Sequence, residues 1–206
     1  MRLYLSSFRI GNIPDELVRL FGYGKRVAII ANATDLVTNE ERVLKIRMEN
    51  ELLENLGFKT EEIDLRDYFS KEDELREALN NFDAIWVRGG NVFLLRRAFR
   101  QSGMDNILRG LLEKDQIAYG GYSAGVCILG PTLKGLEPVD EPYRVSSDYN
   151  KEVIWDGLNI LPYSVAPHYK SDHPESAEVD KCVAYFVEHK MPFKTLVDGE
   201  VITISN

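Results

Sequence analysis

A serine flanked by glycines, in the segment IAYGGYSAGVCILG (residues 117–130), has the residue types and spacing of a catalytic nucleophile. Gly121 lies two residues before Ser123, and Gly125 lies two residues after it. A nucleophile elbow, a sharp turn from strand to helix, needs small neighbours because larger side chains would clash across the turn. Ala124 leaves its backbone N–H open to a developing oxyanion. The pattern favours this function over a serine that only caps the following helix.

A second glycine-containing turn, VRGGNVF (residues 87–93), ends another apolar run. Glycines before a helix expose backbone N–H groups where negative charge is stabilised. Gly89 or Gly90 could then donate to the same oxyanion as the N–H of Ala124. An ordinary turn from strand to helix, with Asn91 as the helix cap, explains the segment equally well.

Three histidines are candidates for the general base that a serine nucleophile requires. His189 lies in the last turn of a predicted helix, where it complements the helix dipole. His173 precedes Pro174 at a helix start, which is typical of a surface turn. His168 ends the apolar run YSVAPHY, where a strand would leave the sheet. His168 is therefore the best candidate.

The acid that would orient the histidine is not selected by these patterns. Asp198 is one candidate, although Asp-Gly between two apolar runs is also a strong hairpin signal. Glu137, Asp140 and Glu141 lie in the segment after the serine and are alternatives. The choice stays open at this point.

The composition limits the class of protein. With 206 residues, 44% of them hydrophobic and 28% charged, the chain is typical of a globular protein, and we expect one domain over residues 1–206. The formal net charge of −8 argues against a nucleic-acid partner, which would require a basic face. Neither the two cysteines nor the helical patterns show a metal-ligand spacing, and no phosphate-binding motif is complete, so we expect no cofactor and no metal.

Targeting signals are not evident in the sequence. The two cysteines form no disulfide framework, and the N-terminal apolar stretch is too short for a signal peptide. No apolar run approaches the length that crosses a membrane. We therefore expect a cytoplasmic protein with no membrane partner.

Short apolar runs alternate with helical patterns along the first 121 residues, which predicts a parallel sheet covered by helices on both faces. In the long helix predicted after residues 26–33, Thr38 and Glu41 form a capping box. Leucine and methionine then recur every four residues and predict its buried stripe at Leu44, Met48, Leu52 and Leu56. The predicted strands span residues 2–8, 26–33, 58–65, 82–90 and 116–121.

The pattern changes after Gly130. Residues 131–151 contain three prolines and little periodicity, which predicts a loop over the edge of the sheet. Residues 159–169 are strand-like, residues 174–190 are predicted to form a helix, and residues 194–204 are predicted to form a hairpin.

Three blocks, IAYGGYSAGV, VRGGNVFLL and LNILPYSVAPHY, together make the sequence similar to the dipeptidase E group of serine peptidases. This group includes aspartyl dipeptidase and is related to cyanophycinase. The resemblance runs from the first strand to the last predicted strands. It implies an α/β fold of the class I glutamine amidotransferase type, a three-layer sandwich with a central, mostly parallel sheet.

The resemblance also implies roles for individual residues. By position, the nucleophile falls on Ser123, the histidine on His168 and the acid on Asp198. The N–H groups of Gly89 and Ala124 would form the oxyanion hole. The implied activity is a serine-type peptidase that hydrolyses short peptides, with a small peptide as its partner and with the chain as a monomer or homodimer.

Some points remain open beside this resemblance. An acid after the elbow has also been proposed for the family, so Glu137 or Asp140 stays an alternative to Asp198. Arg88 stands where the family has the first glycine of a triple-glycine turn. Ala177 or a neighbour replaces an arginine associated with aspartyl specificity, which removes the basis for a preference for N-terminal aspartate. An esterase or amidase with the same elbow, or a non-catalytic member that binds a ligand, is the alternative function.

Overall fold

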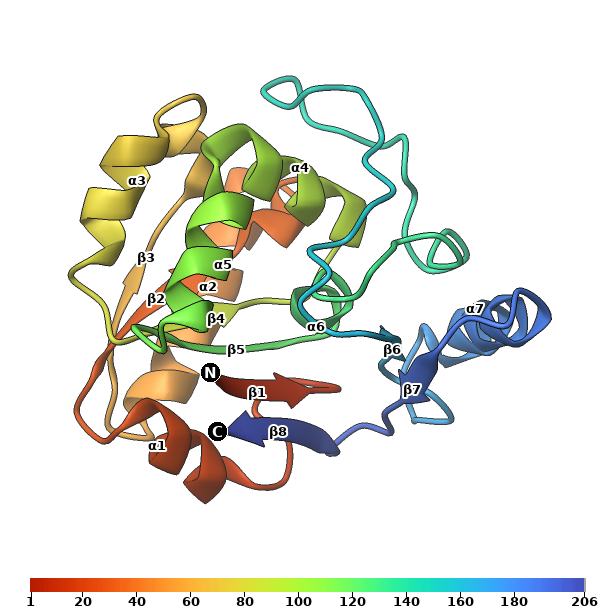
Figure 1. Ribbon diagram of the computed structural model, residues 1–206, viewed down its shortest axis with the longest axis horizontal. Helices are drawn as coiled ribbons and strands as arrows, with labels where there is room; N and C mark the ends of the chain where they lie inside the picture. The colour runs from red at the N-terminus through yellow and green to blue at the C-terminus, as the bar shows by residue number, and fades with distance from the viewer. Residues whose placement is uncertain (206) are drawn as a thin grey trace.

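A six-stranded sheet forms the centre of the computed structural model, which describes residues 1–205 (Figure 1). Its strand order is β3-β2-β4-β5-β1-β8, and all neighbours are parallel except β8, which runs antiparallel to β1 at the edge. The mostly parallel sheet predicted from the sequence is confirmed. The strands are β1 (Arg2–Ser6), β2 (Arg26–Ile30), β3 (Lys59–Glu62), β4 (Ala84–Val87), β5 (Ala118–Tyr122) and β8 (Val201–Ser205).

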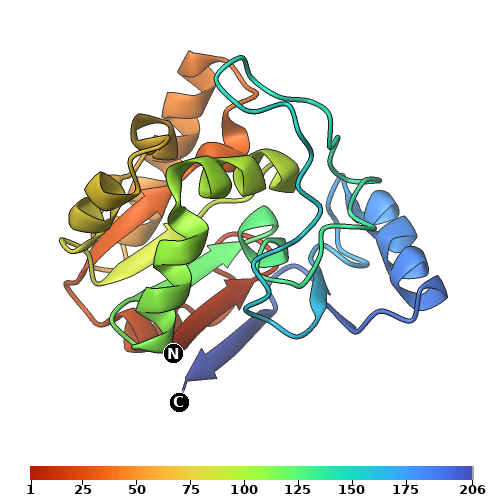
Figure 2. The same cartoon turned by 45° about the horizontal axis from the view of Figure 1, so that its top comes forward.

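Helices cover both faces of this sheet, as Figure 2 also shows. Side chains of a strand alternate between its two faces, so Leu3 and Leu5 enter one buried cluster while Tyr4 enters the other. The first cluster packs beneath α3 (Glu72–Leu79), α4 (Val92–Ser102) and α5 (Met104–Glu113), and the second beneath α1 (Pro14–Phe21) and α2 (Asn39–Glu54). The protein is therefore a three-layer α/β sandwich, as predicted.

A smaller unit follows the sixth helix, α6 (Ala124–Cys127), and the long loop after it. Strands β6 (Ser164–Ala166) and β7 (Phe193–Thr195) form a parallel pair, connected through α7 (Ser176–Glu188). Figure 1 shows this pair and α7 beyond the end of the main sheet.

The hairpin predicted for residues 194–204 is wrong. Its two halves belong to different sheets, because β7 pairs with β6 while β8 pairs with β1. The free edge of β1 offers β8 a partner, so Asp198 and Gly199 form a connection between sheets rather than a hairpin turn. This connection passes the carboxyl end of β1, where the backbone N–H of Ser7 donates to the carbonyl oxygen of Glu200 (3.0 Å).

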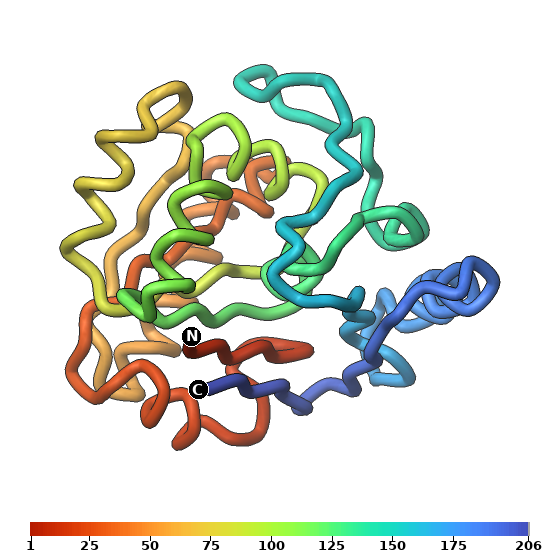
Figure 3. The backbone as a smooth tube through the Cα atoms, viewed as in Figure 1, coloured from red at the N-terminus to blue at the C-terminus, as the bar shows by residue number. Residues whose placement is uncertain are grey.

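The loop predicted over residues 131–151 is present and continues to residue 163, directly before β6. Figure 3 shows it as a long tube that runs beside α4 and returns. An isolated bridge between Thr132 and Asp156 closes its base. The buried guanidinium of Arg97 in α4 donates to the carbonyl oxygens of Pro142 (2.8 Å) and Glu152 (2.9 Å), which fixes the loop to the helix.

The helix α2 begins as predicted, because Thr38 Oγ1 accepts from the N–H of Glu41 (3.3 Å). Its predicted buried stripe is wrong at Leu44 and Met48, while Leu52 and Leu56 are partly buried. Leu44 and Met48 are 47% and 42% exposed, whereas the buried residues are Arg42, Ile46, Glu49 and Leu53. The inward face of α2 packs against charged and polar side chains near the ends of the strands. Arg42 and Glu49 can therefore be buried, because each has a partner of opposite charge there.

No helix in residues 1–205 is both long enough and apolar enough to span a membrane. The expectations of one domain over residues 1–206 and of a monomer or homodimer stay predictions.

Candidate active site

Ser123 lies on a strained turn between β5 and α6. Its backbone has φ 51° and ψ −118°, a conformation with positive φ that residues other than glycine rarely adopt. The turn packs against the end of β4. A Cβ atom on Gly121 or Gly125 would overlap the carbonyl oxygen of Val87. This close approach explains why the residues two positions before and after Ser123 are both glycine. Ser123 therefore has the geometry of a nucleophile elbow.

The backbones of Ala124 and Gly89 lie beside this serine. The N–H of Ala124 opens α6, so the helix itself offers it no acceptor. The backbone of Gly89 approaches so closely that a Cβ added there would lie 2.9 Å from the Cβ of Ser123. The segment after β4 is also the ordinary turn considered above, because Asn91 Oδ1 caps α4 through the N–H of Leu94 (2.8 Å).

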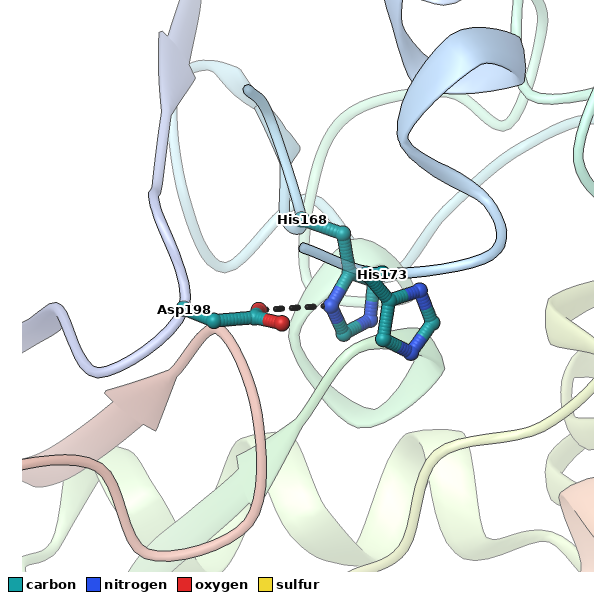
Figure 4. Close-up of side chains that lie close together, drawn as sticks. All are labelled: His168, His173 and Asp198. Atoms are coloured by element: carbon teal, nitrogen blue, oxygen red, sulfur yellow. Dashed lines mark hydrogen bonds and ion pairs between the residues drawn. The ribbon is translucent and has the colours of Figure 1, made fainter. Parts of the chain in front are cut away.

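His168 and Asp198 form a hydrogen-bonded pair. His168 Nδ1 lies 2.7 Å from Asp198 Oδ1 (Figure 4), and the imidazole is 2% exposed. Burial lowers the pKa of His168 below its ordinary value, and the hydrogen bond that His168 donates to Asp198 opposes that shift. The imidazole is therefore neutral near pH 7, and Asp198 fixes which of its nitrogens carries the proton.

Ser7 and Ser171 hold the acid in place, and the sequence analysis did not identify either. The hydroxyl of Ser7 donates to Asp198 Oδ1 (2.8 Å). The backbone N–H of Asp198 donates to Ser171 Oγ (2.8 Å). Both contacts join segments far apart in the sequence, so no local pattern signals them.

His173, assigned above to a surface turn, stacks on His168. The two ring centroids are 3.8 Å apart and the planes differ by 9° (Figure 4). The edge of Phe8 contacts both rings. A positive charge on His173 would repel a protonated His168, and this interaction also lowers the pKa of His168.

The same three side chains could be considered as metal ligands. Ligand atoms of His168, His173 and Asp198 all lie within 4.8 Å of one another, and histidine with carboxylate is a donor set that zinc uses. However, the 2.7 Å between His168 Nδ1 and Asp198 Oδ1 is a hydrogen-bond distance. The geometry therefore favours a hydrogen bond between His168 Nδ1 and Asp198 Oδ1 over a metal ion that both atoms bind.

A cleft of about 290 Å³ opens over Ser123. Ser123, His168 and Gly89 all line it, so the structure brings together three of the predicted site residues at one surface. The remaining lining residues are Phe8, Arg9, Lys45, Met48, Glu49, Leu52, Arg88, Gly90, Tyr122, His173 and Glu175.

Glu49 of α2 connects the two turns that form the site. It accepts hydrogen bonds from the hydroxyl of Tyr122 (2.6 Å) and from Nε1 of Trp86 (3.1 Å), and it forms an ion pair with Arg88 (3.2 Å). Tyr122 directly precedes Ser123, and Arg88 directly precedes Gly89. Arg88, which replaces a family glycine, thus has a buried partner and helps to join the ends of β4 and β5.

The alternative acids Asp140 and Glu137 form hydrogen bonds with other partners. Asp140 accepts a hydrogen bond from the N–H of Val92 (2.8 Å), at the start of α4, and burial raises its pKa to about 7. Glu137 accepts from the N–H of Gly135 within the long loop. Among residues 1–205, neither carboxylate is hydrogen-bonded to His168, although Asp140 lines a small cavity beside Ser123 and His168.

Comparison with known proteins gives a consistent result. Residues 8–206 match the model described as peptidase family S51. An uncharacterized peptidase of Listeria innocua is 29% identical over 148 residues, which are 72% of this chain and 66% of that protein. A Shewanella denitrificans protein named "Peptidase E" is 25% identical over 82% of this chain and 67% of its own length, and a Drosophila melanogaster "Probable alpha-aspartyl dipeptidase" is 24% identical over 65% and 53%. The chain thus spans just under two thirds of the Listeria innocua protein and about half of the Drosophila one.

Two solved structures share the fold. A structure named for peptidase E from Listeria monocytogenes superposes with a TM-score of 0.76 at 23% identity and covers 100% of this chain and 98% of that one. A peptidase from an acI-B1 Actinobacterium gives a TM-score of 0.70 at 14% identity, over 98% and 82%. At these identities the structural likeness concerns the fold.

Proposed function

The chain belongs to peptidase family S51, and from this premise we propose that it is a serine peptidase that hydrolyses short peptides through Ser123, His168 and Asp198. The observation that carries the proposal is the hydrogen bond between His168 Nδ1 and Asp198 Oδ1, made by a histidine that lines the same cleft as Ser123. A strained serine beside a neutral, oriented imidazole is the arrangement that activates a hydroxyl as a nucleophile.

In the proposed reaction, the Oγ atom of Ser123 attacks the carbonyl carbon of the peptide bond. His168 holds its proton on Nδ1, toward Asp198, so Nε2 accepts the serine proton and later delivers it to the leaving amine. Asp198 stabilises the imidazolium that forms between these two steps. A second cycle of attack, with water in place of the serine, releases the acyl group.

The oxyanion of the tetrahedral intermediate would accept hydrogen bonds from the N–H groups of Gly89 and Ala124. These groups belong to two turns that Glu49 joins through Arg88 and Tyr122. Donors held in a fixed position stabilise the transition state without reorganising during the reaction. The ion pair of Glu49 therefore supports the proposed oxyanion hole through the backbone.

The cleft supports a small substrate. Its volume of about 290 Å³ is at the lower end of the range for ligand pockets. It presents the cations Arg9 and Lys45 and the anion Glu175, together with the apolar side chains of Met48 and Leu52. A short peptide carries one charge of each sign at its ends, which suits a cleft that contains groups of both signs.

A panel of dipeptides and p-nitrophenyl esters tests this function, with Ser123→Ala as the control. We expect release of free amino acids by the wild-type protein and none by the variant. We also expect a fluorophosphonate probe to label the wild-type protein at Ser123. Turnover of esters without cleavage of any dipeptide would indicate an esterase, and equal labelling of both proteins would show that Ser123 is not activated.

A further inference from the structure

The hydroxyl of Ser7 contacts both the proposed base and the proposed acid. Ser7 directly follows β1 and is fully buried. Its Oγ accepts a hydrogen bond from the backbone N–H of His168 (2.8 Å) and donates one to Oδ1 of Asp198 (2.8 Å). One buried side chain therefore connects β1 to two segments that lie 161 and 191 residues later in the chain.

The bond to Asp198 acts on the oxygen that matters for the histidine. Oδ1 of Asp198 accepts from Ser7 and from Nδ1 of His168, so two donors fix the position of one carboxylate oxygen. Hydrogen bonds to a charged acceptor are shorter and stronger than those between neutral groups. Without the Ser7 hydroxyl, the hydrogen bond from His168 Nδ1 alone would hold this oxygen in place.

The bond to the backbone of His168 acts on the position of the ring. His168 has a φ of 61°, which a residue with a side chain adopts at some cost. Its buried N–H would have no acceptor if the hydroxyl of Ser7 were removed, and an unpaired buried N–H is unfavourable. The hydroxyl thus stabilises the conformation that directs the imidazole toward the cleft.

We propose that Ser7 is a positioning residue that holds the carboxylate of Asp198 on Nδ1 of His168 and fixes the backbone of that histidine. The role rests on the proposed function, since it matters for catalysis only if His168 acts as the base. In this role Ser7 does not contact the substrate. It acts through Asp198 and His168.

Ser6 provides a matched control. It precedes Ser7, is also fully buried, and its hydroxyl donates to the carbonyl oxygen of Phe8 (3.1 Å) within the same turn. Ser6→Ala therefore removes a buried hydroxyl at the same end of β1 without altering a hydrogen bond to Asp198 or to the backbone of His168.

Steady-state kinetics on a cleaved dipeptide give the first test. We expect Ser7→Ala to lower kcat by about 10- to 100-fold, the effect of losing a hydrogen bond to a charged group. KM should change by no more than about twofold, because binding does not require the oriented imidazole. Ser6→Ala should stay near the wild-type kcat, and an equal loss in the two variants would overturn the proposal.

An isosteric pair keeps the test decisive if Ser7→Ala does not fold. Ser7→Thr and Ser7→Val add the same volume to the buried site, and only the threonine retains a hydroxyl. We expect the threonine variant to be at least about 10-fold more active than the valine variant. Equal activity in two folded variants would show that the hydroxyl is not required.

The imidazole proton gives a readout that does not depend on activity. A short hydrogen bond between His168 Nδ1 and Asp198 produces a far-downfield proton resonance, which we expect in the wild-type and Ser6→Ala proteins and expect to be shifted or lost in Ser7→Ala. An unchanged resonance in Ser7→Ala would overturn the proposal. If the wild-type protein shows the resonance but cleaves no peptide, the proposed function fails while the role of Ser7 is still decided.

Discussion

Two aspartates lie near Ser123 and His168, and their surroundings give them different properties. Asp198, between β7 and β8, is 22% exposed and accepts hydrogen bonds from His168 and Ser7. Asp140, in the loop after the elbow, is also partly buried, but desolvation raises its pKa to about 7. A carboxylate that stabilises an imidazolium must be charged and in contact with the ring, and only Asp198 has that contact. Proximity to the nucleophile is thus a poor guide to the acid.

Asp140 serves a different purpose in this comparison. Its carboxylate accepts from the N–H of Val92, in the first turn of α4, so it joins the long loop to the helix that follows the Gly89 turn. The Asp140 region contributes to the site through the backbone of that turn, whereas the Asp198 region contributes a side chain.

The largest expected effect separates the two aspartates directly. Asp198→Asn should lower kcat by about 10⁴-fold, because the amide favours the wrong tautomer of the histidine. Asp140→Asn should lower kcat by less than about 10-fold, because the amide oxygen can still accept from Val92. Measurement of kcat for both variants checks this, and comparable losses would show that contact with the imidazole does not distinguish the two acids.

The second largest expected effect is a loss of kcat when the backbone of Gly89, in the proposed oxyanion hole, is displaced. Gly89→Ala would place a Cβ atom 2.9 Å from the Cβ of Ser123 and 2.9 Å from the ring of Tyr122. The turn must shift to relieve this contact, and loss of one oxyanion donor costs about 10²–10³-fold in kcat. Gly110→Ala in α5 is the control, since a Cβ there meets nothing within 4 Å and favours the helix. A Gly89→Ala variant with wild-type kcat would remove Gly89 from the oxyanion hole.

The parts of the site that could be predicted from the sequence are those set by local geometry. The glycines around Ser123 follow from the space available in a strand-to-helix turn, and His168 follows from its place at a strand end. Asp198 could not be chosen over Asp140, because the choice depends on a contact across the fold. The Asp-Gly signal even predicted a hairpin, since local turn rules contain no information about the free edge of β1.

The buried face of α2 is another feature that local sequence patterns did not predict correctly. Its leucine and methionine periodicity predicted the buried face, yet Met48 lines the cleft while Glu49 is buried. Periodicity assumes that the interior is apolar. Beneath α2 the interior contains Arg88 and Tyr122, which bind Glu49, so the assumption fails beside the site.

The burial of Asp140 also predicts a dependence of stability on pH. Its pKa of about 7 in the folded protein lies above the value of about 3.9 for an unfolded chain, so the folded state binds the proton more tightly. The contribution of Asp140 to stability is therefore present below about pH 4 and is lost as the pH rises toward 7. Asp140→Asn removes this loss, which amounts to at most about 4 kcal/mol in the free energy of unfolding.

Thermal or urea unfolding between pH 4 and 8 measures this difference. The stability of Asp140→Asn relative to the wild type should rise through that window and then stay constant. Asp148→Asn, exposed in the same loop, is the control and should show no such rise. A constant difference between Asp140→Asn and the wild type would show that Asp140 titrates as an exposed aspartate does.

The smallest expected effect concerns the balance of charges on His168. Asp198 raises the pKa of His168, while burial and the neighbouring His173 lower it, and Glu175 also raises it. His173→Gln removes one of the lowering influences, so the pKa of His168 should rise. The acidic limb of the pH profile of kcat/KM, which reports this base in the free enzyme, should then move to higher pH by less than about one unit.

His189 supplies the control for this shift, because it stacks on Tyr185 at the end of α7 rather than on His168. His189→Gln should leave the acidic limb unchanged. A shift of the limb to lower pH in His173→Gln would mean that His173 stabilises the protonated imidazole. The influence of Asp198 on His168 would then be shared with a second residue, and the contrast between the two aspartates would no longer explain how the base is tuned.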